Sequence, residues 1–223
     1  INALSQKALL YRITDHKENA LKTLTEIESI DPINHFTVFE KLLLGIKNES
    51  EFVNTHRSEF PYQTFLELAL FYHNRNMTAE AIKILEIGPR HFLNSLWMAY
   101  LKKDKIALSS LEDKSIAFVF PYRKESLKML NWAVANNFSW RYKYLLGLNL
   151  MGRSQIEKGI QIFKDLGQNP NDHLFYFIRG MLFKKHQLSG YQKDLQYAYN
   201  LSPKNWRYSF SLAEDHFKSG KSS

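Results

Sequence analysis

The stretch that decides the fold is FLELALFYHNRNMTAEAIKILE, which spans Phe65–Glu86. It contains two runs of apolar residues at helical spacing, and a polar break rich in asparagine separates them. A small residue stands in each run, at Ala69 and Ala81, and lets the two helix backbones approach closely. Tyr72 and Leu85 lie one turn away and fill the space beside that contact. The stretch therefore predicts a pair of antiparallel helices joined by a tight turn.

The same spacing returns at two other places in the chain. Counted from Ala69, steps of 3, 9, 4 and 3 residues reach Tyr72, Ala81, Leu85 and Gly88. Further intervals of 33 residues lead from a small residue at 147 to small residues at 180 and 213. A period of this length indicates stacked helical hairpins that each contact mainly their neighbours. The equivalent positions in the two other copies are Ala8, Tyr11, Ala20, Leu24 and Ile27, and Gly147, Leu150, Gly159, Phe163 and Leu166.

This pattern resembles the tetratricopeptide repeat. The first copy carries that family's closing proline, Pro32 in ESIDPIN, and the copy at YLLGLNLMGRSQIEKGIQIFKDLGQNP has its Leu-Gly pair at Leu146 and Gly147. The resemblance implies an all-α fold, a right-handed α-α superhelix of about six helical hairpins with a C-terminal capping helix. The irregular segment FPYRKESLKMLNWAV, followed by WRYKYLLGL, is similar to the helical C-terminal part of long bacterial proteins. In those proteins a domain of unknown function precedes tetratricopeptide repeats.

The repeats are expected to form a single domain over residues 1–223. Ala8 and Ala69 are 61 residues apart, 7 short of two periods, whereas Ala69 and Gly147 are 78 residues apart, 10 more than two periods. Two parts of the chain are therefore degenerate, and in the second of them Pro121 fits the start of a helix, where its missing N–H needs no partner. The clearest repeats are 1–34, 62–94, 140–171 and 172–204, the degenerate ones are 35–61 and 95–139, and 205–223 forms the cap.

Apolar periodicity and turn residues predict helices along the whole chain, and no linker rich in Ser, Gly or Pro divides it. The boundaries of such predictions carry errors of about 2–4 residues. The expected ranges are 2–14, 17–29, 33–46, 50–58, 62–74, 78–87, 91–103, 105–112, 122–136, 140–151, 154–166, 172–187, 190–200 and 204–218.

Composition excludes several classes of protein. The chain has no cysteine, which excludes disulfides, thiol catalysis and cysteine-based metal sites. Its apolar runs fall far short of the roughly 18 residues that a membrane span needs. It starts at Ile1 rather than Met, so we expect it to be a piece of a longer protein. These observations leave the compartment open, with the cytoplasm slightly favoured.

The sequence carries no motif for catalysis, for a cofactor or for a metal. No two of its eight histidines are four residues apart, and it contains no HExxH sequence. The phosphate-binding patterns GxxxxGKS/T and GxGxxG and the nucleophile pattern GxSxG are also missing. We therefore expect no enzyme activity, no cofactor and no metal site. An enzyme would require a pocket built from distant residues, which a sequence does not reveal.

The candidate binding surface is the face that the first helix of each hairpin contributes. The resemblance places on it the residues three before, one after and four after each small residue. In the C-terminal half these positions are mostly apolar or aromatic, as is typical of interaction sites. A basic rim is expected at Arg141, Arg179, Lys184, Lys185 and Arg207. We expect a peptide or partner protein to bind at Tyr144, Leu148, Met151, Phe177, Met181, Lys184, Phe210 and Phe217.

The expected function is non-enzymatic protein interaction or scaffolding. The face would take a segment with apolar anchors and some acidic character, or it would pack on a missing N-terminal domain of the same protein. The alternative is single-stranded nucleic-acid binding, since residues 121–223 contain 16 Lys/Arg and only 7 Asp/Glu. Because the candidate face is mostly apolar, nucleic acid is the less favoured partner. No membrane partner is expected, and the oligomeric state is not predicted.

Overall fold

The computed structural model describes residues 1–55, 59–117 and 119–218. Within these residues every regular element is a helix and no strand occurs, so the expected all-α class is confirmed. Each helix overlaps one predicted range, and the largest difference is at the start of α9. The helices are α1 (Asn2–Ile13), α2 (Lys17–Ile30), α3 (His35–Leu43), α4 (Glu49–Thr55), α5 (Pro61–His73), α6 (Thr78–Ile87), α7 (Phe92–Lys102), α8 (Lys105–Ser109), α9 (Ser126–Asn136), α10 (Trp140–Gly152), α11 (Ile156–Asp165), α12 (His173–Lys185), α13 (Tyr191–Leu201) and α14 (Trp206–Lys218).

The helices gather into two compact units. Unit 1 is Ile1–Lys103, which contains α1 to α7, and unit 2 is Asp104–Ser223, which contains α8 to α14. At the boundary Lys103 adopts a left-handed conformation with φ of 55°. Asp104 then caps α8, because its carboxylate accepts hydrogen bonds from the first N–H groups of that helix. The single domain over residues 1–223 stays a prediction.

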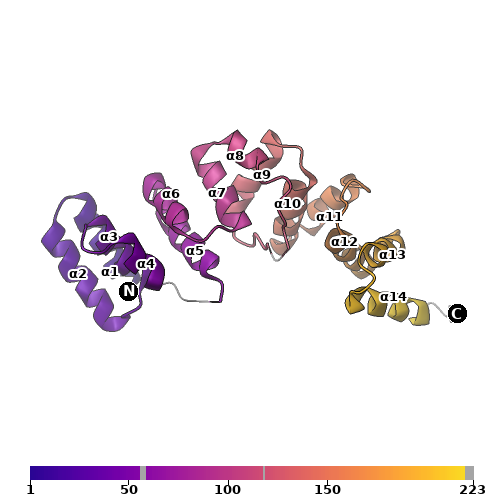
Figure 1. Cartoon of the computed structure of the whole chain (residues 1–223), viewed down its shortest axis with the longest axis horizontal. Coiled ribbons are helices and arrows are strands. Elements are labelled where there is room, and N and C mark those ends of the chain that lie inside the picture. Colours follow the sequence, from indigo (N-terminus) through magenta and orange to yellow (C-terminus); the bar gives the residue numbers. More distant parts are fainter. Residues whose placement is uncertain (56–58, 118, 219–223) are drawn as a thin grey trace. The chain divides into compact units, whose positions relative to one another are not determined.

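Four helix pairs are hairpins with the same turn geometry, namely α1/α2, α5/α6, α10/α11 and α12/α13 (Figure 1). Seven residues after the small residue, each turn has one non-glycine residue in a left-handed conformation; these are Asp15, Asn76, Ser154 and Gln187, with φ of 60°, 62°, 60° and 54°. The N–H of the following residue donates to the carbonyl five residues earlier, over 2.8, 3.1, 3.0 and 2.8 Å. This is the Schellman closure of a helix C-terminus. The interval seen in the sequence is therefore a structural repeat, and the predicted helical hairpins are confirmed.

The small residues of the repeat are buried within these hairpins. Ala8, Ala20, Ala69 and Ala81 are each at most 1% exposed. Between α10 and α11 the fit needs glycine, since a Cβ atom added to residue 159 would lie 2.9 Å from the carbonyl oxygen of residue 147. A Cβ atom on residue 147 would lie 2.6 Å from the ring of Phe163. Real Cβ contacts are longer, so these helices approach as closely as their backbones allow.

The core of unit 1 contains a chain of aromatic rings. Phe39 on α3 lies 5.2 Å from Phe52 on α4 and 5.2 Å from Tyr72 on α5, measured between ring centroids. Phe52 in turn lies 5.3 Å from Phe65. The segment predicted to be degenerate, 35–61, thus supplies two short helices, α3 and α4, whose rings pack against α5.

A buried ion pair lies beside these rings. The carboxylate of Glu40, which is fully buried, accepts a hydrogen bond from the Tyr72 hydroxyl at 2.6 Å and one from Arg12 Nε at 2.7 Å. Burial raises the pKa of Glu40, and the hydrogen bonds from Tyr72 and Arg12 offset that rise only in part. The contact joins α1, α3 and α5, so these three helices of unit 1 are fixed to one another by polar as well as apolar groups.

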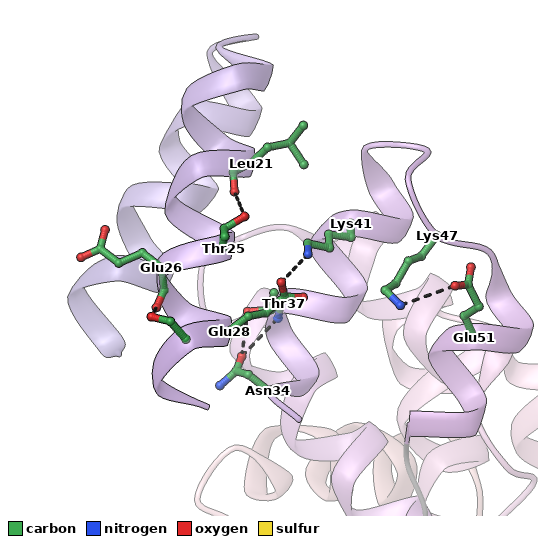
Figure 2. Close-up of polar contacts among 10 residues, drawn as sticks. Leu21, Thr25, Glu26, Glu28, Asn34, Thr37, Lys41, Lys47 and Glu51 are labelled. Carbon is green, nitrogen blue, oxygen red and sulfur yellow. Dashed lines mark hydrogen bonds and ion pairs between the residues drawn. The ribbon is translucent and has the colours of Figure 1, made fainter. Parts of the chain in front are cut away.

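Polar contacts on the surface of unit 1 join α3 to α2 and stabilise the starts of α3 and α4 (Figure 2). Lys41 Nζ lies 2.5 Å from a carboxylate oxygen of Glu28 on α2, and Asn34 caps α3 by accepting a hydrogen bond from the Thr37 N–H at 3.1 Å. Before and within α4, Lys47 and Glu51 form an ion pair of 3.5 Å. These contacts order the short helices, which have too few residues for stability of their own.

The irregular segment before α9 is fixed to α10 in unit 2. Pro121 does not begin a helix, contrary to the prediction, and α9 starts at Ser126. The Asn149 side chain is 2% exposed and donates hydrogen bonds to the carbonyls of Pro121 and, at 3.0 Å, Arg123. If a helix began at Pro121, these carbonyls would accept the hydrogen bonds of its first turns, but here they accept hydrogen bonds from Asn149. The long-range contact therefore overrides the local preference of proline for a helix start.

Candidate interaction face

The first helices of successive hairpins in unit 2 are neighbours. The Trp140 ring on α10 lies 5.9 Å from the Phe175 ring on α12, measured between centroids. The Phe177 ring on α12 lies 4.7 Å from the Tyr208 ring on α14. The structure thus places side by side the three helices that carry the predicted site residues. We call the surface formed by Leu148, Met151, Phe177, Met181, Lys184, Phe210 and Phe217 the first-helix face.

Exposure along this face increases toward α14. Leu148, Met151 and Phe177 are half-buried. Met181 is 40% exposed, Phe210 63% and Phe217 83%. The accessible apolar surface of the face is therefore concentrated on α12 and α14.

Tyr144 is placed differently, since it lies in the core of unit 2. It is only 3% exposed, its ring stacks on the Phe163 ring at 5.5 Å, and the Phe175 ring meets it edge-on at 5.7 Å, both measured between centroids. Burial raises the pKa of its hydroxyl. Tyr144 packs α10 against α11 and α12 and offers no surface to a partner, so the first-helix face excludes it.

Lys184 is the charged residue of the face, and it is held by two carboxylates of α14. Its Nζ atom lies 3.2 Å from Asp215 and 3.7 Å from Glu214. Burial favours the protonated form of Asp215, but hydrogen bonds from Gln192, Tyr191 and Lys184 outweigh it and lower the pKa of this carboxyl. Lys184 therefore joins α14 to α12, and its charge is already paired within the chain.

Arg179, expected on the basic rim, is buried. It is 6% exposed, and its guanidinium forms a two-pronged ion pair with Asp194 on α13, with both N–O distances at 2.7 Å. It also donates to the carbonyls of Phe163, at 3.2 Å, and Gly167, so it satisfies the C-terminal end of α11. The prediction that Arg179 lies on an exposed rim is therefore wrong, because partners on α13 and at the end of α11 hold its side chain inside the unit.

Helix α14 has two opposite faces. Tyr208, Ser211 and Asp215 are buried against the α12/α13 hairpin, at 2%, 7% and 6% exposure. Half a helical turn away lie Phe210 and Phe217 together with Trp206, which is 69% exposed, and Ala213, which is also exposed. The sequence analysis did not select Trp206, although its position four residues before Phe210 places it on the same side of a helix.

A hollow of about 440 Å³ lies elsewhere in unit 2, between α9, α10 and α11. Leu146 and Leu150 of α10 form part of its lining, and they lie on the side of α10 opposite Leu148. The hollow is therefore separate from the first-helix face.

Similarity to known proteins is found among solved structures but not among sequence families. The sequence matches no protein-family model, and no curated protein is matched either. Among solved structures the chain is similar to YrrB, described as a TPR protein with an unusual peptide-binding site, with 15% identity and a TM-score of 0.37 over 92% of this chain and 87% of that one. It is also similar to the MamA RS-1 ArsTM double mutant (17% identity, TM-score 0.35, 91% and 94% covered) and to a tetratricopeptide repeat protein from Parabacteroides merdae (12%, 0.36, 95% and 97%).

The described residues also bear on other classes of site. None of their helices is long and apolar enough to cross a membrane. Among the same residues, no group of three or more His, Asp or Glu side chains is arranged to hold a metal ion. Unit 2 has 18 Lys/Arg and 10 Asp/Glu, whereas unit 1 has 12 of each, so the net positive charge of the chain lies in unit 2.

Proposed function

We propose that the chain is a non-enzymatic protein-interaction module whose first-helix face binds a peptide segment of a partner protein. The observation that carries the proposal is the exposure of Met181, Phe210 and Phe217 on two adjacent helices of one unit. Large apolar side chains that remain accessible on a folded surface usually mark an interaction site. Aromatic residues and methionine are also enriched at the centres of protein interfaces.

The chemistry of the face specifies the kind of segment it takes. Leu148, Met151, Phe177 and Met181 provide apolar contact, and the only charged member of the face, Lys184, is already paired with Asp215. The segment therefore needs apolar anchors, and the surplus positive charge of unit 2 favours acidic residues around them. A domain preceding this chain in the same protein is the other occupant that fits these requirements.

Selection of peptides from a displayed random library on the purified chain tests the proposal. The affinity of each selected peptide is then measured by fluorescence anisotropy for three proteins: the unchanged chain, Met181→Glu and Ile156→Glu. Ile156 is 38% exposed and Met181 is 40% exposed, so the two substitutions are matched in exposure but lie on different helices, α11 and α12. We expect Met181→Glu to weaken binding at least about tenfold, because it places a charge at a desolvated contact.

The control variant Ile156→Glu should bind as the unchanged chain does. Equal affinity of all three proteins for every selected peptide would remove the first-helix face as the binding site. A single-stranded oligonucleotide titrated at rising salt covers the nucleic-acid alternative, because binding through phosphates weakens steeply as salt increases.

A further inference from the structure

Helix α14 carries a stripe of side chains that the other described residues of its unit leave exposed. We call Trp206, Phe210, Ala213 and Phe217 the α14 stripe; the three aromatic side chains are 69%, 63% and 83% exposed. Steps of 4, 3 and 4 residues separate its members, the spacing by which one side of a helix meets a second helix. The opposite side of α14 is already packed against the α12/α13 hairpin through Tyr208, which contacts Phe177 and His173. An occupant of the stripe must therefore come from outside the unit.

The order of residues in the stripe is symmetric for antiparallel pairing. If two copies of α14 cross in opposite directions about a point between positions 211 and 212, Phe210 of one copy lies opposite Ala213 of the other. Trp206 then lies opposite Phe217 of the other copy. Each large ring at the centre meets a small side chain, as in the hairpins of this fold, where small residues admit the bulky residues of the facing helix. A parallel pair would instead place Ala213 against Ala213 and leave a gap beside two facing Phe210 rings.

Charges beside the stripe favour the same arrangement. Arg207 and Glu214 are seven residues apart and therefore lie along the same edge of the stripe. In the antiparallel pair, Arg207 of each copy faces Glu214 of the other, so two pairs of opposite charge form. The carboxylate side chain of Glu214 is 39% exposed and lies 3.7 Å from Lys184 of its own chain.

We propose that α14 is a self-association helix, and that the occupant of its stripe is the α14 stripe of a second copy of this chain in antiparallel orientation. Such a contact is isologous, with the same surface on both subunits, and it closes at a dimer. The inference names the partner of the α14 part of the first-helix face. It rests on the proposed function only through Phe210 and Phe217, which belong to both the first-helix face and the α14 stripe.

The size of the stripe sets the strength of the dimer. Aromatic side chains bury about 150–250 Å² each, so the exposed parts of three rings provide roughly 400 Å² per copy. The total of roughly 800 Å² is below the approximately 1,200 Å² at which stable interfaces begin. The dimer is therefore weak and concentration-dependent, with a dissociation constant on the order of 10–100 µM.

Sedimentation velocity on the chain from about 2 to 300 µM tests self-association. The unchanged chain should shift from monomer to dimer, and Phe217→Ser should stay monomeric throughout the range. Phe138→Ser is the matched control, since Phe138 is an aromatic residue of unit 2 that is 93% exposed and lies outside α14. A chain that is monomeric at all concentrations, or a Phe217→Ser variant that associates like the unchanged chain, would overturn the proposal.

Orientation is tested by disulfide formation, which this cysteine-free chain makes simple to interpret. Two single-cysteine variants, Ser209→Cys and His216→Cys, place thiols on the other edge of the stripe without altering its apolar residues. When they are mixed, the antiparallel pair brings residue 209 of one copy beside 216 of the other, so the mixed disulfide should predominate. Predominance of the 209–209 and 216–216 disulfides would indicate a parallel pair and overturn the arrangement. Met181→Glu should leave dimerisation unchanged, so failure of peptide binding and failure of dimerisation are separate results.

Discussion

The substitution Gly159→Ala tests the close approach of α10 and α11. An added Cβ atom would lie 2.3 Å from Met151 Cγ and 2.9 Å from the carbonyl oxygen of Gly147. The methionine side chain can move away, but the carbonyl belongs to the backbone of α10, so the two helices must separate. Overpacking of this kind costs about 1–3 kcal/mol, whereas replacing glycine by alanine inside a helix gains about 1 kcal/mol. We expect a net loss of about 1 kcal/mol in the free energy of unfolding.

Gly152→Ala is the matched comparison, because Gly152 ends α10 and a Cβ atom there meets nothing within 4 Å. This variant should gain about 0.5–1 kcal/mol through helix propensity alone. Urea unfolding followed by circular dichroism measures both, and a change of 1 kcal/mol moves the midpoint by about 0.5 M at a typical m-value. Hydrogen exchange of the α10 and α11 amides assigns the change to this hairpin. If Gly159→Ala stabilises the chain as Gly152→Ala does, the reasoning about backbone contact is refuted.

Three further predictions concern unit 2, and urea midpoints measure all of them. Gln187→Gly should stabilise by about 0.5–1 kcal/mol, because Gln187 has a left-handed φ of 54° that glycine adopts without strain; an unchanged midpoint would contradict this. Asp194→Ala should destabilise by about 3–5 kcal/mol, since it leaves the buried guanidinium of Arg179 without its carboxylate, and a loss below 1 kcal/mol would contradict it. Because folding lowers the pKa of Asp215, its contribution to the free energy of unfolding is present above its ordinary pKa near 3.8 and is lost as the pH falls through the lower folded value. The variant Asp215→Asn should therefore be less stable than the unchanged chain at pH 7, and its stability should depend less on acid.

Local signals made the hairpins predictable from the sequence. The intervals from Ala8, Ala69 and Gly147 specify which residues meet, and the turn at the seventh position follows in each case, at Asp15 and Asn76 for example. Such features depend on neighbours within one hairpin, so a short stretch of sequence contains both partners. The positions of the helices in the described residues were for this reason predicted closely.

Features that depend on contacts between hairpins were not predictable in this way. Pro121 fits a helix start locally, but Asn149, 28 residues away, holds its carbonyl. Arg179 was expected on a basic rim beside the candidate face, yet Asp194 pairs with it inside the unit. Tyr144 has the sequence position of a surface residue and is nevertheless covered by rings from α11 and α12. In each case the deciding partner lies on another helix, and its approach is set by packing rather than by local pattern.

The most direct test of the fold is the distance between the alanines of one hairpin, measured in solution. With alanine methyl groups labelled, nuclear Overhauser effects should connect Ala8 with Ala20 and Ala69 with Ala81, because the small residues of the two helices are buried where the helices meet. If these methyl groups instead show effects only to other residues and none to each other, the pairing of helices through small residues is wrong.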